Sequence, residues 1–240
     1  MKKRIRTQGI LMFSSLALVI LLSRFFFPSW KEKSYDEILD AAGIGMILLG
    51  FLFRISARGY KAEQSADGKR FVAGGPYRLL RHPMYFGTLL IGLGVIAVLL
   101  NQWAVLIFLV VFLLLYVPQT RKEERALRRQ FGDVYASYCS KTPGYFPNLS
   151  LFLRSNSAPC LPLKSAWIRK EWTSVIGTCL FIMGIEIWED VRLFGRAEYK
   201  EETLKLALYF LCALFLMGVC CQTGSGVRGE GTPKARQRGG

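Results

Sequence analysis

Six apolar stretches separated by polar segments set the pattern of this chain. They cover residues 10–27, 38–53, 84–100, 103–117, 174–188 and 203–221. These runs are too long and too evenly spaced to fit inside one soluble core. The third and fourth are shorter than the roughly 20 residues that usually cross a bilayer, but both can be extended into flanking residues. The pattern predicts an all-α, polytopic membrane protein with about six transmembrane helices.

Local signals refine these elements. The polar pair Asn101–Gln102 is short enough to make the third and fourth helices a hairpin, and Pro118 predicts the end of the fourth. Gly43, Gly45 and Gly50 are small residues of the kind that lets membrane helices pack closely. The first stretch follows a basic segment, as in a secretory signal, but no small-residue cleavage site follows it. We therefore expect a retained helix.

The charge distribution predicts the orientation. The chain has a net charge of +15, and its basic residues lie between apolar stretches instead of on one soluble face, so a nucleic-acid partner is not expected. Segments 1–9, 54–82, 119–173 and 222–240 hold 25 basic and 7 acidic residues, against 7 and 10 elsewhere. The positive-inside rule then places both termini in the cytoplasm, with these segments facing membrane lipids and cytosol.

Metal chemistry is not expected from the sequence. The six cysteines form no CxxC pair, and the chain has a single histidine, so we expect no zinc or iron site. Few polar residues interrupt the third and fourth apolar stretches, which argues against a channel or a transporter.

Two polar stretches flank the predicted hairpin, "FVAGGPYRLLRHPMYFG" and "QTRKEERALRRQFGDVYASYCSKTPGYFP". Together they resemble the isoprenylcysteine carboxyl methyltransferase and phospholipid methyltransferase superfamily. The residues that carry the resemblance are Gly75, Pro76, Tyr77, Arg81, His82, Pro83, Met84, Tyr85, Gly87, Glu123, Glu124, Leu127, Phe131, Gly132, Tyr135, Tyr138, Pro143 and Pro147.

The resemblance implies an integral membrane methyltransferase that takes S-adenosylmethionine from the cytoplasm and a lipophilic acceptor from the bilayer. It places the cofactor site at the cytoplasmic end of the third/fourth helix hairpin. The implied cofactor-binding residues are Val72, Tyr77, His82, Pro83, Met84, Tyr85, Glu123 and Glu124. It identifies no catalytic base, and Arg81 and Arg121 are the candidates for positioning the acceptor.

The same residues have compatible physical properties. Pro83 is well suited to be a first helical residue, and the helix start would offer free N–H groups and a positive dipole end to a carboxylate. Tyr77 and Tyr85 can present ring faces to a sulfonium. Gly87 would leave room for a ligand against the helix, and Glu123 could accept hydrogen bonds from ribose or from an ammonium.

Several residues also allow structural interpretations. Thr120 and Glu123 have the spacing of a capping box after Pro118, and Glu124 could exchange roles with Glu123. His82 could hydrogen-bond at the membrane interface. Tyr135 and Tyr138 could be interface anchors, and Gly132 would end the helix that precedes them.

The predicted organisation has four parts. They are N-terminal transmembrane helices (1–53), a methyltransferase core (54–147), a linker with two C-terminal helices (148–221) and a disordered basic tail (222–240).

The resemblance leaves three classes of methyl acceptor open. We expect a prenylcysteine-type carboxylate, a phospholipid amine or a small thiol. Eukaryotic isoprenylcysteine enzymes place a substrate-contacting arginine where this chain has Gln119, which weakens the carboxylate reading. The alternative function is that of an inactive homologue acting in membrane assembly or interaction.

Overall fold

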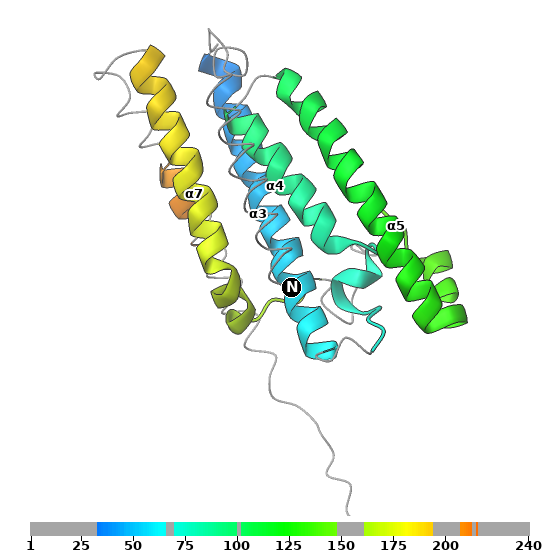
Figure 1. Ribbon diagram of the computed structural model, residues 1–240. Coiled ribbons are helices and arrows are strands. Elements are labelled where there is room, and N and C mark those ends of the chain that lie inside the picture. The colour runs from blue at the N-terminus through cyan, green and yellow to red at the C-terminus, as the bar shows by residue number, and fades with distance from the viewer. Residues whose placement is uncertain are drawn as a thin grey trace, which may run out of the picture.

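The described part of the protein is helical throughout. The computed structural model describes residues 33–65, 70–99, 102–147, 161–193, 207–212 and 215, and these ranges contain no strand. Its elements are α3 (Lys33–Gln64), the short 3-10 helix η1 (Gly75–Arg78), α4 (Pro83–Leu99), α5 (Gln102–Lys141) and α7 (Ser165–Leu193). In Figure 1, α7, α3, α4 and α5 follow one another across the view with a common tilt. The predicted all-α class is confirmed.

Two of these helices are long and apolar enough to cross a bilayer. Residues Ile38–Gln64 of α3 and Ala104–Lys141 of α5 both contain windows with a mean hydropathy of 2.0, and Pro83–Val98 is a shorter apolar helix. Many large apolar side chains of α5 are exposed, as expected for a lipid-facing helix. The predicted first helix and most of the sixth lie outside the described residues, so the number of six remains a prediction.

Some helix boundaries coincide with the ends of the apolar stretches, and others lie well beyond them. As predicted, α4 begins at Pro83, and α5 begins at Gln102, directly after the hairpin turn. However, α3 continues past the apolar run to Gln64, and α7 begins at Ser165, well before the expected start. Polar turns therefore extend both helices beyond their apolar parts, and the first of these extensions supports the site described below.

The break predicted at Pro118 is wrong. Helix α5 runs through Pro118 to Lys141. An interior proline removes one backbone hydrogen bond, but side chains around it supply others. Thr120 Oγ1 donates to the Val117 carbonyl at 3.0 Å, and Gln119 Nε2 donates to Glu123 Oε1 at 2.9 Å. The regular helix is interrupted instead at Gly132, whose non-helical φ of 49° and ψ of −122° agree with the predicted end of a helix there.

Glycines set the packing of α4 against α3. A Cβ atom on Gly50 would lie 2.6 Å from the Gly87 carbonyl oxygen, and one on Gly87 would lie 2.5 Å from the Gly50 oxygen. Gly43 and Gly94 make the same reciprocal contact, so the two antiparallel helices approach backbone to backbone at two points. The packing role of Gly43 and Gly50 is confirmed. A Cβ on Gly45 would meet no described residue within 4 Å, so its packing role remains a prediction.

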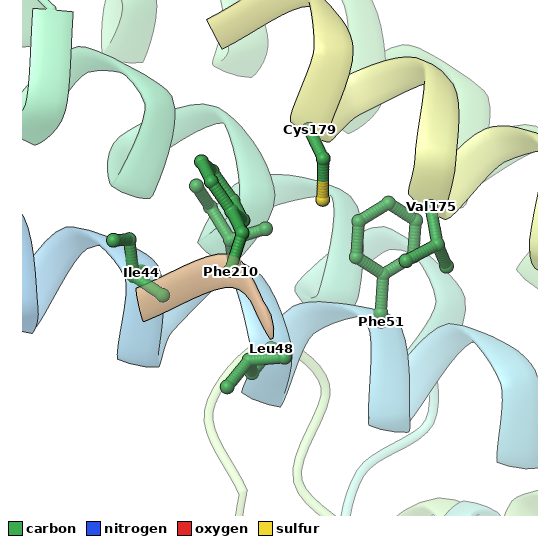
Figure 2. Close-up of a pocket in the computed structure, with 7 residues that line it drawn as sticks. Ile44, Leu48, Phe51, Val175, Cys179 and Phe210 are labelled. Atoms are coloured by element: carbon green, nitrogen blue, oxygen red, sulfur yellow. The ribbon is translucent and has the colours of Figure 1, made fainter. Parts of the chain in front are cut away.

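Helix α7 packs against α3 and also contacts α4. Phe51 and Ile55 of α3 are buried with Trp167, Val175 and Ile182 of α7. Figure 2 shows Phe210 joining Ile44, Leu48, Phe51, Val175 and Cys179 around a cavity of only about 10 Å³. Arg58 pairs with the buried Glu171, so both polar and apolar contacts fix α7 to α3.

Candidate active site

The loop between α3 and α4 is anchored on the polar end of α3. A Cβ atom on Gly74 would lie 2.3 Å from the hydroxyl oxygen of Tyr60, and Gly75 has a φ of 55° that favours glycine. The Tyr77 hydroxyl donates to the Ala57 carbonyl at 3.4 Å. Leu79 and Leu80 are buried against Phe53, a cluster that holds η1 and the following residues next to the start of α4.

The second polar stretch closes over this loop. The Tyr138 hydroxyl donates to the Tyr77 carbonyl at 2.6 Å, and the Arg81 amide donates to the Pro143 carbonyl at 2.9 Å. The ring of Phe71 contacts the rings of Phe131, Tyr135 and Tyr138. The two motifs, which are distant in sequence, therefore form one unit. Val72, the sequence neighbour of Phe71, is half-buried.

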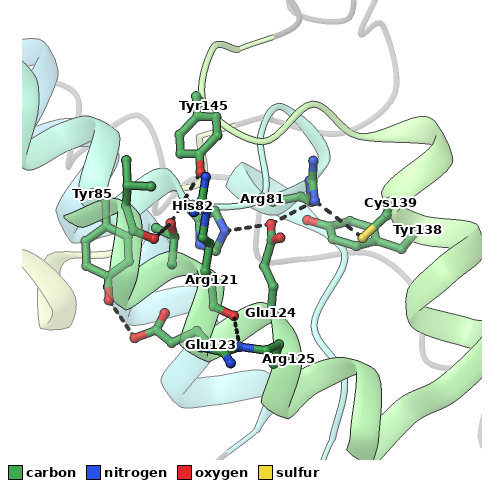
Figure 3. A network of polar contacts seen from close by, with 12 residues as sticks. Arg81, His82, Tyr85, Arg121, Glu123, Glu124, Arg125, Tyr138, Cys139 and Tyr145 are labelled. Carbon is green, nitrogen blue, oxygen red and sulfur yellow. Dashed lines mark hydrogen bonds and ion pairs between the residues drawn. The ribbon is translucent and has the colours of Figure 1, made fainter. Parts of the chain in front are cut away.

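Glu124 joins the loop to α5. Its Oε1 accepts a hydrogen bond from Arg81 Nη1 at 2.7 Å and lies 3.1 Å from His82 Nε2, as Figure 3 shows. Burial lowers the pKa of Arg81, but the Glu124 carboxylate and other neighbours raise it more, so the guanidinium stays charged. His82 is 8% exposed. Glu124 is thus placed to hold two neighbouring loop side chains at once.

Glu123 has a different set of partners. Its Oε1 accepts hydrogen bonds from the Tyr85 hydroxyl at 2.5 Å and from Gln119 Nε2 at 2.9 Å. Burial raises the pKa of Tyr77, and the nearby Glu123 and Tyr85 raise it further, so these three side chains lie within electrostatic reach of one another. We call Tyr77, Tyr85 and Glu123 the tyrosine–carboxylate cluster.

The capping-box interpretation of Glu123 is wrong. Thr120 lies inside α5, where its hydroxyl bonds to the Val117 carbonyl and lies 3.4 Å from the Tyr145 hydroxyl. A capping box needs Thr120 at the first boundary of a helix, and α5 has no boundary there. The carboxylate of Glu123 is therefore directed to Tyr85 across the hairpin, as Figure 3 shows.

The start of α4 offers fewer free N–H groups than the sequence suggested. Pro83 has no N–H, and the amides of Tyr85 and Phe86 both donate to the His82 carbonyl, at 3.2 and 3.1 Å. In the described part of the chain the Met84 amide has no such backbone partner. The room expected beside Gly87 is filled by α3, so that prediction is wrong.

The two candidate arginines are placed differently. Arg81 is at the Glu124 pair and lines an open groove of about 470 Å³ with Cys139, Lys141, Thr142 and Phe146. Arg121 is exposed on α5, and its carbonyl accepts a hydrogen bond from Arg125 Nε at 3.3 Å. No group of three or more potential metal-ligating side chains occurs among the described residues.

Two residues near the cluster were missed by the sequence analysis. Arg54 Nη1 donates to Thr88 Oγ1 at 2.9 Å, and the ring of Tyr116 lies 5.1 Å from that of Tyr85. Both belong to segments outside the two motifs. The available signal was an arginine that directly follows the apolar run of α3, where a cation meets the edge of a membrane span.

Comparisons with known proteins agree with the motifs. The sequence model of the phospholipid methyltransferase family matches residues 39–134. The cobalt-zinc-cadmium resistance protein CzcN of Cupriavidus metallidurans is 42% identical over 83 residues, which cover 34% of this chain and 37% of that protein. The nickel-cobalt-cadmium resistance protein NccN of Alcaligenes xylosoxydans xylosoxydans is 38% identical over 145 residues, or 60% of this chain and 64% of that protein.

A plant enzyme is a more distant relative. Protein-S-isoprenylcysteine O-methyltransferase B of Arabidopsis thaliana is 26% identical over 159 residues, covering 60% of this chain and 79% of that protein. The chain therefore spans less than two thirds of the two resistance proteins but more of the plant enzyme. No solved structure matches the sequence.

Proposed function

Because residues 39–134 belong to the isoprenylcysteine carboxyl methyltransferase and phospholipid methyltransferase superfamily, we propose that this chain transfers a methyl group from S-adenosylmethionine to a lipophilic acceptor. The observation that carries the proposal is the tyrosine–carboxylate cluster at the start of the α4–α5 hairpin. It brings two aromatic rings and one carboxylate together from both motifs.

This cluster fits the charges of the cofactor. S-adenosylmethionine carries a sulfonium and an ammonium, and aromatic faces and a carboxylate attract both. Its methionine carboxylate fits the start of α4, where the Met84 amide and the positive helix end are placed. Burial raises the pKa of Tyr77, so its hydroxyl stays protonated and its ring is a neutral aromatic face.

Methyl transfer depends more on the positioning of the cofactor and the acceptor than on acid–base catalysis. When bound, the cofactor supplies an electrophilic methyl group, whose bond to sulfur breaks as the acceptor's electron pair forms the new bond, leaving a neutral thioether. Tyr85 and Glu123 orient the sulfonium, which is the main contribution required for an in-line transfer. A carboxylate or thiolate acceptor needs no base, whereas an amine would have to arrive deprotonated.

Glu124 has a supporting role in this proposal. By holding Arg81 and His82, it sets the position of the residues that lead into Pro83, Met84 and Tyr85. His82 would then contact the cofactor from a fixed ring orientation. Gln119, which replaces the arginine of eukaryotic isoprenylcysteine enzymes, donates to Glu123 and so helps to fix the same carboxylate.

The proposed location follows from the charge bias and the apolar helices. The protein is a multi-pass membrane protein whose termini and active site face the cytoplasm, where the cofactor is dissolved. The acceptor reaches the site from the bilayer. Its class stays open at this point among prenylcysteine-type carboxylates, phospholipid amines and small thiols.

Two measurements test the function. Calorimetry on the purified chain in detergent should detect S-adenosylmethionine binding in the micromolar range, about −8 kcal/mol. Membranes containing the chain, incubated with methyl-labelled cofactor, should yield a labelled lipophilic product that mass spectrometry can identify. A folded protein that binds no cofactor would contradict the proposal and favour an inactive homologue that acts in membrane assembly.

A further inference from the structure

We propose that one face of α5 binds the headgroups of anionic phospholipids at the edge of the bilayer. Five exposed cations follow the membrane-spanning part of this helix within about three turns. They are Arg121, Lys122, Arg125, Arg128 and Arg129. We call these five residues the basic face of α5. The interaction is independent of methyl transfer, so it can be measured on the chain without cofactor.

The five cations share one side of the helix. With 3.6 residues per turn, they fall within an arc of about 120°. The two acids of the same stretch lie outside this arc. Glu124 bonds to Arg81, and its neighbour Glu123 bonds to Tyr85, as Figure 3 shows. The basic face is therefore on the side of α5 that is turned away from the candidate active site.

The basic face continues the lipid-facing side of the membrane span. Val111, Leu114 and Pro118 fall in the same arc, and all three are exposed, Leu114 by 70%. The helix rises about 28 Å between Gln102 and Arg121, close to the roughly 30 Å thickness of a hydrocarbon core. The cations therefore begin at the depth where acyl chains end and headgroups start.

The charges of this face are not neutralised by the described part of the protein. None of the five cations forms an ion pair with a described carboxylate. Arg125 is four residues from both Arg121 and Arg129, a spacing at which like charges destabilise a helix. Anionic headgroups would supply the opposite charge and relieve this repulsion.

A membrane surface fits this arrangement better than a soluble acidic partner does. The cations continue an exposed apolar side without a break, so a partner at this face has to lie against the bilayer. Lysine and arginine side chains can lay their aliphatic parts on apolar surface while their charged ends reach phosphates. Since the same turns of α5 carry Glu123 and Glu124, headgroup binding would also fix the depth at which the active site lies.

Lipid binding to the purified full chain in a neutral detergent tests this proposal without turnover. The probes are dioleoylphosphatidylglycerol, which is anionic, and dioleoylphosphatidylcholine, which has the same acyl chains and no net charge. Native mass spectrometry should show the anionic lipid bound about tenfold or more tightly, because each basic residue near an anionic surface contributes about fivefold. The preference should fall as salt is raised. Equal affinity for the two lipids would overturn the proposal.

Paired variants assign the preference to α5. Lys122→Gln combined with Arg125→Gln should reduce it about fivefold or more. Lys61→Gln combined with Arg70→Gln is the matched control, because it removes the same two types of charge from exposed positions outside the basic face, and it should retain the preference. An unchanged preference in the folded α5 variant, or an equal loss in the control, would contradict the assignment.

Soluble competitors separate a lipid surface from other anionic partners. Glycerophosphoglycerol, which is the headgroup without acyl chains, and polyglutamate at the same concentration of negative charge should both fail to displace the bound phosphatidylglycerol. Displacement by polyglutamate would assign the face to an acidic protein, and displacement by the free headgroup would assign it to soluble phosphodiesters. Either result would overturn the proposal. S-adenosylmethionine affinity, measured separately, reports on the proposed function alone.

Discussion

Glu124 and His82 are joined by a contact of 3.1 Å between Oε1 and Nε2, although they lie 42 residues apart in the sequence. This contact explains why the single histidine of the chain precedes an apolar helix. It ties the loop before α4 to the polar part of α5, and Arg81 bonds to the same carboxylate oxygen. Two adjacent glutamates of α5 thus have separate tasks, because Glu123 is bound to Tyr85.

The first prediction concerns stability. Glu124→Gln removes the charge that Arg81 and His82 share, and hydrogen bonds to charged groups contribute roughly 1.5–3 kcal/mol when buried. Since Glu124 is 31% exposed, we expect a loss near the lower end of that range. Thermal unfolding of the protein without cofactor measures it. An unfolding midpoint equal to that of the wild type would contradict the holding role of Glu124.

The second prediction concerns cofactor affinity. Glu123→Gln keeps an oxygen that can accept from Tyr85 but removes the negative charge proposed to attract the cofactor. We expect the affinity for S-adenosylmethionine to fall about ten- to a hundredfold, while the stability without cofactor changes little. Calorimetry on both glutamate variants separates the roles. An affinity loss in Glu124→Gln alone would transfer the cofactor role to that residue.

The third prediction concerns the helix packing that positions the loop. Gly50→Ala would place a methyl group 2.6 Å from the Gly87 carbonyl oxygen, and such overpacking costs typically about 1–3 kcal/mol. Gly45→Ala is the matched control on the same helix, because its Cβ would meet no residue of the described ranges within 4 Å. There, alanine should stabilise the helix by up to about 1 kcal/mol. Thermal unfolding of the two variants should therefore move in opposite directions from the wild type.

These glycines also show what the sequence could predict. A small residue in an apolar stretch signals close packing, but the partner depends on how two helices meet. Gly43 and Gly50 are seven residues apart, as are Gly87 and Gly94, and this shared spacing was the readable signal for their pairing. Gly45 falls off that spacing, and Gly87 was misassigned to ligand space because its partner lies on another helix.

The helix ends also include some that the sequence predicted correctly and some that it did not. Pro83 was predicted correctly because a first-turn proline depends only on local geometry. Pro118 was predicted wrongly because local rules omit the contacts of Thr120 with Val117 and Tyr145 and that of Glu123 with Tyr85. The contact of Arg54 could not be predicted from its position after an apolar run, since its partner Thr88 belongs to another helix.

The last prediction concerns which side of the membrane carries the site. Tyr138 bonds to the Tyr77 carbonyl and Glu124 bonds to Arg81, so the loop before α4 and the polar part of α5 must share one side. The excess of 25 basic over 7 acidic residues in the segments predicted to be cytoplasmic assigns that side to the cytoplasm.

Labelling with an impermeant thiol reagent tests both statements. In a background without native cysteines, Ser65→Cys and Ser137→Cys should react only from the cytoplasmic side. Gln102→Cys, at the hairpin turn, should react only from the other side, because the apolar parts of α4 and α5 separate it from the site. Reaction of the two serine positions from opposite sides would contradict the active site itself. If both react from outside, the site stays intact but the orientation is reversed, and a cytoplasmic cofactor could not reach it.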